Sequence, residues 1–145
     1  MKEWILSVFF LQNKLKDLAA QIDSEIKIYS LSLTMDTNKL FDKVMQLQDK
    51  RRRVVNFKVL YDIMKDNLSA SEKTILADSA KGNSFNEIGQ KLNVSKSTAA
   101  RYFKQAIDKC TNVAHSLNFT LERFKKEYGD ILLIHKTASK FSKNN

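Results

Sequence analysis

The chain has no proline, only three glycines and a single cysteine in 145 residues. Proline and glycine are the residues that most disfavour helix interiors, so their scarcity predicts an all-α, almost entirely helical protein. One cysteine, Cys110, excludes an internal disulfide and is compatible with a reducing cytoplasm, where we expect the protein to act. We interpret Cys110 as a small apolar residue that closes the last turn of a helix.

Motifs for catalysis and metal binding are also missing. The two histidines, His115 and His135, lie far apart, and neither has a cysteine or carboxylate at metal-ligand spacing. The sequence contains no Gly-rich phosphate loop, no GxSxG and no HExxH. We therefore expect a protein that is not an enzyme and that binds neither a metal nor a cofactor.

The apolar run Trp4–Leu11 has the composition of a signal peptide but not its other features. Glu3 stands where a basic residue is expected, and no small-residue cleavage site follows. The run is also too short to span a bilayer. A membrane-surface helix flanked by Lys2 and Lys14 is an alternative. We favour a partner-binding or core helix and expect no membrane association.

The net charge is +9, from 25 basic and 16 acidic residues. Such a balance suits a polyanionic partner, although an anionic membrane would also attract it. The charge is spread evenly, with +3 in each of residues 1–66, 67–110 and 111–145. A functional assignment therefore depends on sequence motifs more than on charge.

Residues 68–110 have the pattern of three short helices. Ser69–Glu72 and Ser84–Glu87 both match the capping box, in which a serine and a glutamate satisfy free backbone N–H groups. Gly82-Asn83 is typical of a left-handed helix end. Asn93-Val94 then predicts a tight turn before a third helix.

The third helix is predicted from about Lys96 to Lys109, with Ser95 as its cap. A short helix, a tight turn and a longer helix form a helix-turn-helix. Small residues, Gly89 and Ala99, stand where two such helices approach closely. The side chains expected to face outward suit base edges and phosphates: Lys96, Ser97, Ala100, Arg101, Lys104 and Gln105.

The segment EIGQKLNVSKSTAARYFKQAIDKC resembles the helix-turn-helix of sigma factor region 4 and of LuxR-type regulators. The matching features are Glu87-Ile88-Gly89, the Leu92-x-Val94-Ser95 turn, Ala99, and Ala106-Ile107 followed by Lys109. The upstream helix resembles the first helix of the same domain, so the match covers residues 68–110.

This resemblance implies a role for individual residues. Lys96, Ser97 and Arg101 occupy base-reading positions, and Ala100 can touch a thymine methyl. Thr98, Lys104, Gln105 and Ser84 would contact the DNA backbone. Because helix N-termini favour anions, Ser95 is a further candidate phosphate contact beside Ser84.

The first 66 residues predict two long helices. Apolar residues from Trp4 to Tyr29 recur in steps of three and four, as in one long helix that pairs with another, within the chain or across a dimer. Residues 30–38 interrupt the period, and a second helix is expected over 39–65. We expect residues 1–66 to form a helical hairpin or coiled-coil-like region for oligomerisation or partner binding, and we expect a homo-oligomer, a dimer, to form through these N-terminal helices.

The second helix contains a dense basic run, Arg51-Arg52-Arg53. One interpretation is a solvated helix face partly neutralised by Asp49. The alternative is an auxiliary phosphate clamp beside the helix-turn-helix, because arginine binds phosphate through two hydrogen bonds.

The last segment, 111–145, predicts a fourth long helix that ends near Gly129. The apolar residues 131–134 could form a helical turn or a short strand, and the basic tail 136–145 is expected to be disordered.

The leading hypothesis is a sequence-specific regulator of transcription that binds double-stranded DNA, alone or with RNA polymerase. The helix order also resembles small phage or mobile-element regulators of the ArpU and RinA kind. One alternative is a sigma-like polymerase subunit. Another is the DNA-binding subunit of a recombination or DNA-packaging complex.

Overall fold

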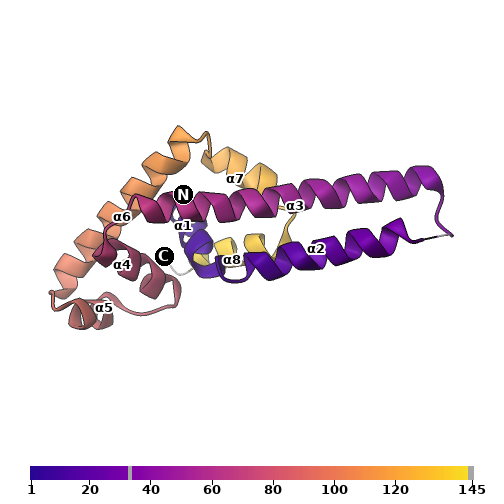
Figure 1. Ribbon diagram of the computed structural model, residues 1–145. Helices are drawn as coiled ribbons and strands as arrows, with labels where there is room; N and C mark the ends of the chain where they lie inside the picture. Colours follow the sequence, from indigo (N-terminus) through magenta and orange to yellow (C-terminus); the bar gives the residue numbers. More distant parts are fainter. Residues whose placement is uncertain (33, 144–145) are drawn as a thin grey trace.

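The computed structural model describes residues 1–32 and 34–143, which form eight helices and no strand (Figure 1). The predicted all-α class is therefore confirmed, and residues 132–134 belong to a helix. None of the described helices combines the length and apolar character needed to cross a membrane. The helices are α1 Lys2–Leu11, α2 Leu15–Ser30, α3 Thr37–Asp66, α4 Ala70–Ala80, α5 Phe85–Leu92, α6 Lys96–Ser116, α7 Leu121–Tyr128 and α8 Leu132–Lys143.

The single N-terminal helix predicted over Trp4–Tyr29 is wrong, because the chain breaks at residues 12–14 into α1 and α2. Helix α1 is buried on nearly every side, with Ile5, Val8 and Leu11 fully covered. A helix that is apolar all round belongs in a core rather than along one partner. The chain therefore turns at the exposed Asn13 so that α2 can leave the core and run beside α3.

Helices α2 and α3 form an antiparallel pair whose far ends extend away from the other helices (Figure 1). Ile22 of α2 and Leu47 of α3 are buried on their facing sides. Asp36 starts α3 by accepting a hydrogen bond from the Lys39 N–H. The predicted helix over 39–65 and the predicted link before it are confirmed, while residue 33 of that link lies outside the described residues.

The helix starts predicted between residues 69 and 95 are present. Ser69 and Glu72 form the reciprocal capping box at α4. The second capping box is half formed: Ser84 accepts from the Glu87 N–H, while the Glu87 carboxylate binds the Ser84 hydroxyl. Ser95 accepts from the Thr98 N–H at the start of α6.

The turn between α5 and α6 depends on two conformational features. Asn93 adopts the left-handed conformation with φ 57°, which asparagine tolerates better than most residues. At Gly89 a Cβ atom would lie 2.7 Å from the carbonyl oxygen of Val94. Only a glycine lets the backbone of the turn fold back so closely on α5.

The C-terminal third differs from the prediction. Helix α6 continues to Ser116, and the chain then turns at Asn118 (φ 61°) into the short α7, so residues after Cys110 are not one separate long helix. The expected disordered tail is wrong up to Lys143, because Ile134 and Ala138 of α8 are buried in the core. Asn144 and Asn145 lie outside the described residues.

One hydrophobic core holds the chain together. It contains residues of all three predicted segments, including Val54, Leu76 and Phe124. Trp4 stacks on Phe124 with ring centres 5.6 Å apart and planes 12° apart. Helices α4 and α6 are therefore anchored to α1 and α3, and they share one core with α8.

Candidate nucleic-acid interface

The first turns of α6 present the predicted DNA-contacting side chains on one exposed face. Lys96, Ser97 and Arg101 are exposed, as are Lys104 and Gln105 one turn later, while Thr98 and Ala100 are half-buried. On the opposite face, the core contains Ala99, Ala106 and Cys110, each fully buried. The division of α6 into an apolar inner face and a cationic outer face agrees with the sequence pattern.

Two ion pairs link α5 and α6 to α4. The Lys109 ammonium group donates to the Glu72 carboxylate at 2.8 Å and links α6 to α4. Lys91 donates to Asp78 at 3.0 Å and links α5 to α4. Both carboxylates are almost fully buried, with side chains 9% and 7% exposed. Glu72 therefore neutralises Lys109, while neither carboxylate is paired with Lys96, Arg101 or Lys104 at the start of α6.

Glu72 is ionised in its buried position. Burial raises the pKa of a carboxyl, but hydrogen bonds from Lys109 and from the Ser69 N–H and hydroxyl outweigh this effect and lower the pKa of Glu72 below its ordinary value. The exposed Lys109 balances this charge by an ion pair with the buried Glu72, so the pair is structural.

The hydroxyl groups of the two cap serines are engaged within the chain. The Ser84 hydroxyl donates to Glu87 at 3.2 Å, and the Ser95 hydroxyl donates to the Thr98 hydroxyl at 2.9 Å. Both also accept a backbone N–H. A phosphate at either helix start would therefore be bound through backbone N–H groups. The exposed Glu87 carboxylate opposes an anion at the start of α5.

A basic hollow of about 540 Å³ adjoins Lys96 and extends the cationic surface toward α1 and α8. Its lining includes Lys81 at the end of α4, Lys140 of α8, and the phenyl rings of Phe85 and Phe103. No carboxylate is among its described lining residues. Lys81 and Lys140 were not predicted from the sequence, because only the packing of α4 and α8 brings them beside Lys96.

The arginines 51–53 lie elsewhere. They occupy the middle of α3, and Arg53 stands thirteen residues before its last residue, Asp66. At 1.5 Å per residue this is about 20 Å along the helix axis from the start of the α4–α6 region. The structure does not bring these arginines together with the exposed face of α6.

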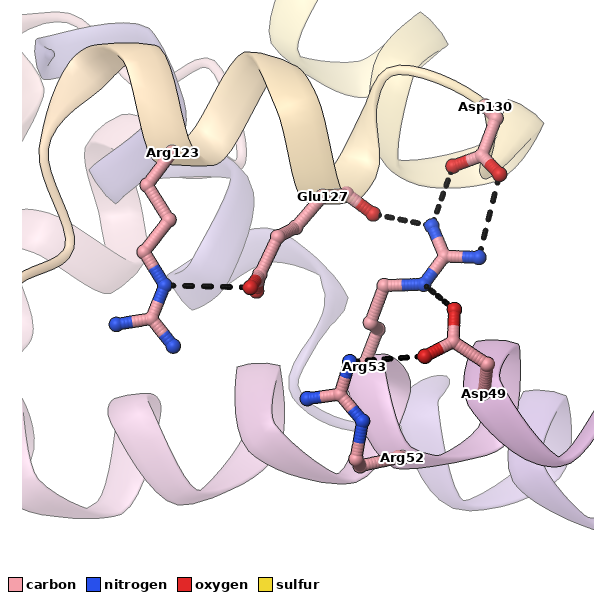
Figure 2. A network of polar contacts seen from close by, with 6 residues as sticks. All are labelled: Asp49, Arg52, Arg53, Arg123, Glu127 and Asp130. Atoms are coloured by element: carbon pink, nitrogen blue, oxygen red, sulfur yellow. Dashed lines mark hydrogen bonds and ion pairs between the residues drawn. The ribbon is translucent and has the colours of Figure 1, made fainter.

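Figure 2 shows that Arg53 binds partners within the chain. Its guanidinium group contacts both carboxylate oxygens of Asp130, the Glu127 carbonyl oxygen and the Asp49 carboxylate. The Arg53 side chain is only 11% exposed. The hydrogen bond from Arg53 lowers the pKa of Asp130. Arg53 thus connects α3 to the segment between α7 and α8.

Arg51 and Arg52 are exposed and form ion pairs, with Asp23 at 2.6 Å and with Asp49 at 2.9 Å. This arrangement matches the solvated helix face that was one of the two interpretations of the run. Their role as auxiliary phosphate contacts stays a prediction.

The described residues contain few groups that could act as a nucleophile or bind a metal ion. Burial raises the pKa of the Cys110 thiol to about 12, so it remains protonated and unreactive at neutral pH. In the described part of the chain, no three His, Cys, Asp or Glu side chains lie close enough to share a metal ion.

Comparison of the chain with protein-family models, with curated proteins and with solved structures finds no match. The assignment of function therefore rests on the residues and their geometry.

Proposed function

We propose that the protein is a sequence-specific DNA-binding regulator of transcription that inserts the first half of α6 into the major groove. The observation that carries this proposal is the exposed set Lys96, Arg101 and Lys104 at the start of a capped helix. The left-handed turn at Asn93 separates this helix from the short α5. A helix of this kind fits the major groove, and its N-terminal residues reach base edges.

The side chains divide into two roles. Arg101 can donate two parallel hydrogen bonds to a guanine, while Lys96 and Ser97 reach neighbouring bases and Ala100 touches a thymine methyl. Lys104, Gln105 and Thr98, with the N–H groups at Ser84 and Ser95, contact phosphates. Lys81 and Lys140 extend the phosphate contacts over the basic hollow beside α6.

A sigma-like polymerase subunit is a weaker proposal. Promoter melting needs exposed aromatic side chains, whereas Trp4 and Phe9 of α1 are buried at 5% and 7% exposure. The N-terminal aromatics therefore support the core of this chain. A DNA-binding subunit of a recombination or packaging complex would use the same α6 surface, and the test below separates it from a regulator.

The test is selection of bound DNA from a random duplex pool, with and without RNA polymerase, at about 150 mM salt. We expect enrichment of one consensus that Arg101→Ala weakens and Lys126→Ala leaves unchanged, because Lys126 is an exposed lysine on the separate helix α7. No enrichment at this salt would refute the proposal. Enrichment only with polymerase would favour the sigma-like subunit, and ring-shaped oligomers in light scattering would favour the packaging subunit.

A further inference from the structure

Helix α3 has a second apolar face that no other helix covers. Its residues follow one another in steps of four, three, four, three and four, which places them on one line of a helix. This exposed α3 face consists of Phe41, Met45, Gln48, Arg52, Val55 and Val59.

The exposed apolar residues of α3 are clustered along one line of the helix rather than scattered over the surface. Phe41 is 64% exposed, Met45 50%, Val55 38% and Val59 47%. Single exposed apolar residues are normal on a protein surface. Here, however, four of the nine large exposed apolar side chains in the described residues share one heptad line. The side of α3 that carries Leu47 and Val54 already packs on α2, and this line lies beside that contact.

Hollows lie on both sides of the exposed α3 face. Toward α2, one hollow of about 450 Å³ is lined by Ala19 and Ala20 together with Val55 and Val59. Toward α7, another is lined by Val59 and Leu117. When a second helix packs on such a face, its side chains fit into hollows of this kind beside the row of apolar residues.

The side chains of the exposed α3 face are arranged symmetrically about residue 50. This symmetry indicates which helix could pack on the face. Phe41 and Val59 lie equally far from residue 50, as do Met45 and Val55, and as do Gln48 and Arg52. In an antiparallel helix pair, positions before the centre of one helix meet positions after the centre of the other. A second α3 would therefore meet apolar side chains with apolar ones and polar side chains with polar ones.

The two polar residues nearest the centre of the face, Gln48 and Arg52, also favour this antiparallel register. In an antiparallel pair, Arg52 would meet the partner's Gln48, whose amide oxygen can accept from its guanidinium group. Arg52 also donates to Asp49 of its own chain at 2.9 Å, so its charge is balanced beside the contact. A single polar layer within an apolar seam selects register and orientation, because any shift leaves it against apolar groups.

We propose that two copies of this chain pair in an antiparallel manner through the exposed α3 face, around a two-fold axis at the level of residue 50. This pairing does not depend on DNA binding. The four apolar side chains offer on the order of a few hundred Å² per copy, less than the roughly 800 Å² of a standard interface. The dimer should therefore dissociate at micromolar concentrations.

The first experiment is sedimentation equilibrium of the full chain between about 1 and 200 μM. We expect a reversible dimer whose dissociation constant rises at least about tenfold in Val55→Glu, because a carboxylate would be buried at the seam. Ile28→Glu is the matched control, since Ile28 is 70% exposed on α2 and lies outside the face. Circular dichroism melts establish that both variants fold.

The second experiment tests the orientation. When Met45→Cys and Val55→Cys chains are mixed and mildly oxidised, we expect cross-linked heterodimers. Neither variant should cross-link alone, because identical positions would lie about 15 Å apart along the axis, beyond the reach of a disulfide. The native Cys110 is fully buried and does not compete. A chain that stays monomeric, a dimer insensitive to Val55→Glu, or self-cross-linking of Met45→Cys would each overturn the proposal.

Discussion

Lys109 and Glu72, 37 positions apart, form a 2.8 Å hydrogen-bonded ion pair beneath the exposed face of α6. The same carboxylate accepts from the Ser69 N–H at 3.0 Å and completes the capping box of α4. One side chain therefore both starts α4 and holds α6. Because α6 carries the proposed base-reading residues, under the proposed function this pair would set how the helix is presented to DNA.

We expect Glu72→Gln to lower the free energy of unfolding by about 1 kcal/mol, since glutamine keeps the cap but loses the charged partner of Lys109. The folded pKa of Glu72 is lowered, so its contribution is complete above the ordinary glutamate pKa and is lost as the pH falls through the folded pKa. Urea unfolding at pH 7 and pH 3 should show a smaller acid loss in the variant. Glu87→Gln, at the matching position of the exposed second cap, is the control. An equal acid loss in Glu72→Gln and the native chain would contradict the role of Glu72.

Arg101→Ala should reduce affinity for the best DNA site by about 1–3 kcal/mol, or roughly 5- to 150-fold, and relax one base position of the consensus. The reason is the loss of two hydrogen bonds to a base edge. Fluorescence anisotropy with the selected site and single-base variants measures both effects. If every sequence weakens equally, Arg101 is a phosphate contact instead.

Lys104→Ala should weaken binding to all sequences alike. One fewer phosphate contact releases one fewer counterion, so the slope of log K against log salt should fall by about 1. Affinity measured between about 50 and 200 mM salt gives this slope. An unchanged slope would remove Lys104 from the proposed interface.

Arg53→Ala should destabilise the fold by about 1–3 kcal/mol, because it leaves Asp130 and the Glu127 carbonyl without their partner. The DNA salt slope should not change, since the Arg53 side chain is 11% exposed and already paired. Arg51→Ala is the control and should cost less than about 1 kcal/mol, because Arg51 is 44% exposed. A slope reduced in Arg53→Ala would support the phosphate clamp instead.

Tyr128→Phe should leave stability unchanged or raise it by about 1 kcal/mol. The Tyr128 hydroxyl is buried without a hydrogen-bond partner in the described part of the chain, and such a group is costly to desolvate. The ring itself should stay in place against Phe57, 4.8 Å away. Thermal melts compare it with the half-buried Tyr29→Phe. A clear loss of stability would reveal a partner for the hydroxyl.

The sequence by itself determined the features that depend on neighbouring residues. The starts of α4, α5 and α6 follow from serine caps that bond three residues ahead, and the turn at Asn93 follows from the same short range. The inner and outer faces of α6 follow from its helical period. These features could be predicted from the sequence because each interaction joins residues within one or two turns of the same helix.

Only the tertiary structure decided the features that depend on distant residues. The break between α1 and α2 exists because α1 is enclosed by other helices, and α8 is ordered because Ile134 and Ala138 enter the same core. Arg53 pairs with Asp130 across 77 positions, so an arginine predicted as an auxiliary phosphate contact also forms an internal link that the sequence did not reveal. Periodicity shows that a helix has an apolar face, but not what will cover it. Which element covers the face depends on how much apolar surface the whole folded chain can bury in its core.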